Sequence, residues 1–161
     1  MRAVAPGYHH RMRKLVLALI VIASTSTPAR ADSFALGLFV GDPLGLDINI
    51  GLQRRSSLDI VLGANTVRDG RVSYGHVTYL YTLYTGHGQS VRIPLRLGFG
   101  GAVFDLVEGD DVGLAARVPF ELGLRFRRSP LEIYGEITFL LVLVPDVDPN
   151  LDGGIGLRLY F

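Results

Sequence analysis

The chain has 161 residues, 48% of them hydrophobic, and it contains neither cysteine nor tryptophan. Its length allows one domain, and its composition excludes disulfides and a lipid-modified cysteine. Five of the 16 basic residues but none of the 15 acidic ones precede residue 32, so residues 32–161 carry a net charge of 11 − 15 = −4, which argues against a nucleic-acid partner.

The first 31 residues have the pattern of a Sec-type signal peptide. Arg11, Arg13 and Lys14 precede the apolar run Leu15–Ala23, and small residues lead to a cleavage position after Ala31. An uncleaved anchor helix is the alternative, but the apolar run is shorter than the ~20 residues that a spanning helix needs. We therefore predict a signal peptide over residues 1–31 and one folded domain over residues 32–161.

The rest of the chain alternates large apolar residues with polar or small ones, the pattern of β-strands that have one apolar face. Helical periodicity appears nowhere after the leader. Turn sequences rich in Gly, Pro, Asp and Ser separate the alternating segments. These segments are 34–40, 46–53, 58–64, 74–84, 91–100, 114–125, 132–141 and 152–161.

Two prolines fall inside predicted strands. Pro94 and Pro119 each remove a hydrogen bond from a β-ladder. We expect a β-bulge at each, or a pairing partner displaced by one residue.

The last segment carries an aromatic residue at the end of its apolar face. Ile155, Leu157, Leu159 and Phe161 share that face. Such a strand suits the closure of an outer-membrane barrel, and its aromatic residue suits interfacial anchoring. We expect this strand to engage the barrel-assembly machinery during insertion.

An even number of strands of about ten residues predicts an all-β fold, an eight-stranded antiparallel up-and-down transmembrane β-barrel. A soluble sandwich or lipocalin-like barrel is the alternative, because alternation alone does not identify the inner face. The apolar face, however, carries about four large side chains on nearly every strand, more than an eight-stranded lumen holds. We therefore expect a monomer whose apolar side chains face the lipid of the outer membrane.

The polar face would line the lumen, where Gly alternates with ions of both signs. Buried ions need partners, because an uncompensated buried charge costs about 3–5 kcal/mol. A four-residue turn over 127–130 would place Arg125 opposite Glu132. We expect a salt-bridged, closed lumen, with a narrow ion or solute channel as the alternative. The predicted network comprises Asp47, Asp59, Arg92, Arg96, Arg117, Glu121, Arg125, Glu132, Glu136 and Arg158.

The outer loops would be four short and mostly acidic segments if both ends of the barrel domain lie in the periplasm. Many barrels keep their binding surfaces on long outer loops. Short loops disfavour an adhesin, and ligand binding through them is a second alternative function. The loops expected are 41–45, 66–73, 105–111 and 145–151.

We predict no enzymatic activity and no catalytic, cofactor or metal site. His76 and Thr78 are similar to the His and Ser of lipid A deacylase barrels, but they fall on the predicted lumen face instead of the lipid face. Residues 146–153 place oxygen ligands at alternate positions, as calcium loops do. Leu151 and Leu157 stand where an EF-hand needs Gly and Glu, so we expect an acidic surface turn there.

The turns and strand ends of the chain carry a family resemblance. The stretches concerned are Gly41–Leu46, Leu58–Asp59, Arg117–Leu122, Pro130–Glu136 and Gly154–Phe161. In these stretches the chain resembles a family of small outer-membrane barrels of unknown function from spirochaetes and other Gram-negative bacteria. More loosely, it is similar to the membrane domains of OmpA and OmpX. The resemblance implies the barrel fold and the outer membrane, and it implies no chemistry.

Overall fold

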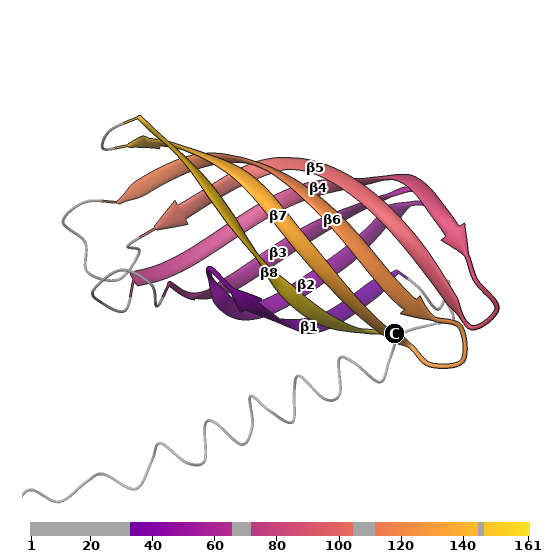
Figure 1. The fold of residues 1–161 in the computed structure, drawn as a ribbon. Helices are drawn as coiled ribbons and strands as arrows, with labels where there is room; N and C mark the ends of the chain where they lie inside the picture. Colours follow the sequence, from indigo (N-terminus) through magenta and orange to yellow (C-terminus); the bar gives the residue numbers. More distant parts are fainter. Residues whose placement is uncertain (1–32, 66–71, 105–111, 145–146) are drawn as a thin grey trace, which may run out of the picture. The chain divides into compact units, whose positions relative to one another are not determined.

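The computed structural model describes residues 33–65, 72–104, 112–144 and 147–161. These residues form eight antiparallel strands that close into one barrel (Figure 1), so the predicted all-β barrel is confirmed. None of the described residues belongs to a helix long and apolar enough to cross a membrane. The segment predicted as a signal peptide lies outside the described residues. The strands are β1 Phe34–Gly41, β2 Leu44–Gln53, β3 Ser56–Asn65, β4 Val72–His87, β5 Val91–Phe104, β6 Gly113–Phe126, β7 Leu131–Val144 and β8 Asp148–Tyr160.

Each strand pairs with its neighbours in sequence, and β8 returns to pair with β1. Leu38 lies opposite Leu157 in this closing ladder. The amide of Phe161 donates a 2.8 Å hydrogen bond to the carbonyl of Phe34, and the two rings lie 6.3 Å apart between centroids. The sheet therefore has no open edge, which a strand structure in lipid requires.

β8 begins earlier than the sequence indicates. Residues 148–153 belong to the strand, with Asp148 opposite Val142 and Gly153 opposite Ile137 on β7. The expectation of an acidic turn here was wrong for these residues, because pairing along the length of β7 overrides their turn preference. Outer loops were expected at 66–73, 105–111 and 145–151. Of these, residues 66–71, 105–111 and 145–146 lie outside the described residues, and residues 72–73 belong to β4.

The two prolines cause no register shift between β5 and β6, and ladder pairs are simply missing beside them. The constant register places Pro94 opposite Gly123 and Pro119 opposite Gly98. A Cβ atom on Gly123 would lie 2.9 Å from Cγ of Pro94, so the glycine makes room for the ring. The bulge or displacement expected at Pro119 was wrong, since its register with β7 is also continuous.

A register shift does occur on the other side of Pro94, in β4. It lies between Thr82 and Tyr84, directly before Thr85, the partner of Pro94. Leu83 and Tyr84 are consequently both exposed, at 48% and 68%. The displacement that we expected at this proline is therefore found on the neighbouring strand.

Polarity is inverted relative to a soluble fold. Phe99 is 67% exposed, and every strand presents further large apolar side chains outward. Arg158 and Glu132, in contrast, are 0% exposed. Side chains alternate between the inner and the outer face along each strand. Within the described strands, every charged residue falls on an inward position of this alternation.

The lumen is filled in layers. Toward the end opposite the 88–90 and 127–130 turns lies an apolar cluster formed by Tyr74, Ala102, Ala115 and Leu140. Below it lie the buried ions. A second small cluster joins Phe39, Val61 and Tyr134.

Candidate functional site

Eight of the ten predicted lumen ions are buried inside the barrel. They come from six strands, because inward positions recur at every second residue of each strand. The apolar face of each strand points outward, so these polar side chains have only the lumen to occupy. The eight are Asp47, Asp59, Arg96, Arg117, Glu121, Glu132, Glu136 and Arg158.

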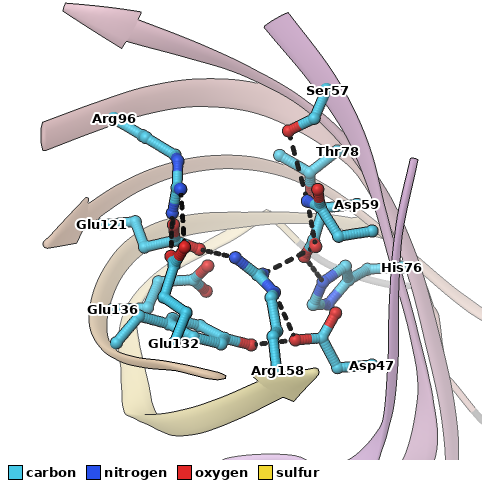
Figure 2. Close-up of polar contacts among 12 residues, drawn as sticks. Asp47, Ser57, Asp59, His76, Thr78, Arg96, Glu121, Glu132, Glu136 and Arg158 are labelled. Atoms are coloured by element: carbon cyan, nitrogen blue, oxygen red, sulfur yellow. Dashed lines mark hydrogen bonds and ion pairs between the residues drawn. The ribbon is translucent and has the colours of Figure 1, made fainter. Parts of the chain in front are cut away.

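Arg158 on β8 is the centre of the network, as Figure 2 shows. Its Nε donates to Asp47 Oδ2 at 2.7 Å, Nη2 to Asp59 Oδ1 at 2.7 Å, and Nη1 to Glu121 Oε2 at 2.9 Å. All four side chains are at most 1% exposed. One guanidinium thus connects β8 with β2, β3 and β6 through charge-assisted hydrogen bonds.

Tyr134 supports Arg158 from β7. The guanidinium carbon of Arg158 lies 3.7 Å from the centroid of the Tyr134 ring, a cation–π contact. The hydroxyl of Tyr134 donates to Asp47 Oδ2 at 2.5 Å. Gly156 lies against the same ring, and a Cβ atom there would overlap it. The small residue on β8 therefore provides the space for the ring.

Arg96 forms the second centre, toward the turn end of the barrel. Its Nη1 donates to both Glu121 Oε1 and Glu132 Oε1, and its Nη2 lies 3.1 Å from Glu132 Oε2. Tyr160 donates its hydroxyl to Glu132 Oε2 at 3.0 Å. Because Glu121 contacts both arginines, Arg96 and Arg158 belong to one connected network.

Arg117 forms a further group nearer the apolar cluster. Its Nη2 donates to Glu136 Oε1 and lies 3.0 Å from Thr138 Oγ1, while Nη1 donates to Thr78 Oγ1 at 2.7 Å. Thr138 in turn donates to Glu136 at 2.7 Å. The hydroxyl groups thus satisfy polar atoms that a buried ion pair alone would leave without partners.

His76 and Thr78 both face the lumen, at 3% and 1% exposed. His76 Nδ1 lies 3.1 Å from the hydroxyl of Tyr74, and Nε2 lies 3.7 Å from Asp59 Oδ2. Thr78 accepts its hydrogen bond from Arg117. This geometry holds both side chains inside the barrel and away from its outer surface.

Two predicted members, Arg92 and Arg125, are not among the buried ions. Arg125 is opposite Glu132 in register, as the turn length indicates, but the Glu132 carboxylate binds Arg96. Arg92 is exposed and Arg125 half-buried, because both stand at strand ends where the lumen opens. The eight buried ions carry a net charge of 3 − 5 = −2 when all of them are charged.

The predicted network contained only charged residues and left out its neutral members, although Thr78 was expected on the lumen face. They share the inward alternation of the charged residues, and that signal could have identified them. The sequence could not show which residue each of them hydrogen-bonds to, because that residue often lies on the other side of the lumen. These residues are Asn49, Thr78, Tyr134, Thr138 and Tyr160.

Within the described ranges, no group of three or more His, Cys, Asp or Glu side chains is placed to hold a metal ion. A scan against protein-family models finds no match for the chain. Searches of curated proteins and of solved structures likewise find nothing similar.

Proposed function

We propose that this chain is an integral outer-membrane β-barrel protein with a closed, salt-bridged lumen and a structural or surface-interaction role. The observation that carries the proposal is the inverted polarity. Exposed leucines and phenylalanines surround a fully buried set of arginines and carboxylates. In water, an apolar outer surface and a buried set of ions are both unfavourable. In the hydrocarbon of a membrane, the apolar outer surface is favourable.

The height of the outward apolar face supports a membrane location. On β6, outward residues from Leu114 to Phe126 are apolar without interruption. Twelve residue steps at about 3.3 Å along a strand tilted by about 40° rise roughly 30 Å. This rise matches the hydrocarbon thickness of a bilayer.

The closing strand supports the outer membrane as the destination. Ile155, Leu157 and Leu159 face outward on β8, and Phe161 follows them at 62% exposed. Only helices and closed barrels satisfy their backbone groups in lipid. Together with the predicted signal peptide, this strand favours export followed by insertion through the barrel-assembly machinery.

The filled lumen favours a structural role over conduction. The Arg158 and Arg96 centres cross the interior from several strands, and the apolar cluster lies above them. An eight-stranded barrel is just filled by its inward side chains. The filled lumen therefore favours a role without an aqueous path, and the role that we propose includes no catalysis and no cofactor.

Expression of the full chain in a Gram-negative host, followed by separation of its membranes, tests the proposal. We expect the protein in the outer-membrane fraction, with a mature chain that begins at Asp32. In planar bilayers the purified protein should give no discrete conductance. Recovery from the periplasm as a soluble protein would contradict the location, and stable conductance steps would contradict the closed lumen.

A further inference from the structure

A basic cavity lies at the turn end of the barrel, outside the buried network. It has a volume of about 300 Å³. The residues that line it come from the start of β5, the end of β6 and the turn that follows. They are Arg92, Arg125, Phe126, Arg127, Arg128, Ser129 and Pro130. We call this the arginine pocket.

Backbone contacts fix the frame of the arginine pocket. The amide of Arg127 donates to the carbonyl of Ser90 at 3.0 Å, and the amide of Tyr160 donates to the carbonyl of Pro130 at 2.8 Å. The 127–130 turn is thereby tied to the 88–90 turn on one side and to β8 on the other. The guanidinium of Arg125 lies 3.7 Å from the centroid of the Tyr160 ring. The pocket is therefore built by several elements and not by one turn alone.

The arginine pocket is lined by positively charged side chains, which favours the binding of an anion. Arg92 and Arg125 stand directly opposite each other in the β5–β6 ladder, and like charges at such positions are destabilising. Among the described residues, no carboxylate lines the pocket and no ion pair involves Arg92, Arg127 or Arg128.

The chemistry of the pocket matches a phosphate group. Guanidinium groups bind phosphate oxygens in a bidentate manner, and arginine suits this contact better than lysine. Ser129 adds a hydroxyl donor to the lining. A volume of about 300 Å³ is at the small end for ligand pockets, so it fits a headgroup and not a whole lipid.

The position of the pocket favours a lipid as the source of that phosphate. Phe126 lines the pocket and is also 37% exposed as the last outward residue of β6, with Leu124 and Leu122 next along the same face. Acyl chains could lie along this apolar face while the headgroup entered the pocket. Within the proposed function, on which this inference rests, this rim meets the headgroups of the periplasmic leaflet.

We propose that the arginine pocket binds the phosphate of an anionic phospholipid whose acyl chains lie on the apolar face beside Phe126. Each arginine near an anionic headgroup strengthens binding severalfold. The interaction selects lipids by net charge, because a zwitterionic headgroup carries a cation that the four arginines repel.

The test uses the full chain expressed in a Gram-negative host and purified from membranes in a non-ionic detergent. Native mass spectrometry measures the binding of phosphatidylglycerol and of phosphatidylcholine. The pocket variant is Arg127→Gln with Arg128→Gln. The matched control is Arg54→Gln with Arg55→Gln, which removes the same charge from the β2–β3 turn at the same end of the barrel. Inorganic phosphate serves as a competitor.

We expect the unsubstituted protein to bind phosphatidylglycerol at least tenfold more tightly than phosphatidylcholine. The affinity for phosphatidylglycerol should fall tenfold or more in the pocket variant and change less than twofold in the control. Equal binding of the two lipids, or equal losses in the two variants, would overturn the inference. Displacement of the lipid by millimolar phosphate would also overturn it, in favour of a site for a free anion. Heat-modifiable gel mobility of each protein reports the barrel separately. Its absence in the unsubstituted chain would overturn the proposed function, whereas failure of lipid binding with the mobility shift intact overturns the pocket alone.

Discussion

Nε of Arg158 on β8 donates a 2.7 Å hydrogen bond to Asp47 Oδ2 on β2, across the strand β1 that lies between them. This bond connects strands on both sides of the β8–β1 closure. The same guanidinium reaches Asp59 and Glu121. The final strand therefore supplies a cation that pairs with carboxylates from three other strands.

Replacement of Arg158 with Met should strongly destabilise the barrel. It leaves Asp47, Asp59 and Glu121 without this cation, and an uncompensated buried charge costs about 3–5 kcal/mol. Arg92→Met is the matched control, because Arg92 is exposed, and it should change stability by no more than about 0.5 kcal/mol. Unfolding by urea in detergent measures both. Similar midpoints for the two variants would show that the network does not support the fold.

Arg117 and Glu136 should be energetically coupled. Their side chains form an ion pair in the lumen, and groups in direct contact show coupling energies of about 0.5–3 kcal/mol. A double-mutant cycle with Arg117→Met and Glu136→Gln measures the coupling. A second cycle that combines Arg117→Met with Arg92→Met provides the comparison, and it should be additive within about 0.5 kcal/mol. Additivity in the first cycle would contradict the ion pair.

Two glycines should differ in their tolerance of a side chain. A Cβ atom on Gly37 would collide with the carbonyl oxygen of Leu157 on β8, whereas one on Gly135 meets nothing within 4 Å. We expect Gly37→Ala to cost about 1–3 kcal/mol through overpacking at the closing seam. Gly135→Ala should be nearly neutral. The free energies of unfolding of the two variants check this, and equal values would argue against the close β1–β8 approach.

An arginine in the middle of the outward face should be costly. Phe120 lies near the centre of the apolar run on β6 and is 45% exposed. In lipid, Phe120→Arg should cost about 2–4 kcal/mol, and Leu52→Arg near the end of β2 about 0–1 kcal/mol. Refolding into lipid vesicles at a series of urea concentrations measures both. If Phe120→Arg folded as well as Leu52→Arg, the outward face would not be facing hydrocarbon.

Sequence alternation identified which residues face inward, because that depends only on position within one strand. It also gave the Arg125–Glu132 register, which a four-residue turn fixes locally. It could not show that Arg158 meets Asp59, 99 residues earlier in the chain. Contacts across the lumen depend on the stagger that accumulates around the closed barrel. Arg92 and Arg125 lie at the mouth because they stand at strand ends, whereas Arg96 lies farther along β5 and is buried.

The start of β8 was misjudged for a related reason. Pro149, Asn150 and Gly153 are turn-forming residues, yet they lie in the strand. The partner strand β7 extends to Val144, and pairing with it outweighs local preference. The start of β8 therefore follows the length of β7, which a local pattern does not reveal.

The central claim is that a closed barrel presents its apolar face to lipid. Its most direct test is the electrophoretic mobility of the protein refolded in detergent, with and without boiling and after protease treatment. We predict a compact, protease-resistant band that changes mobility only on boiling. A chain that stayed soluble without detergent, showed no mobility shift and was fully digested would contradict the claim.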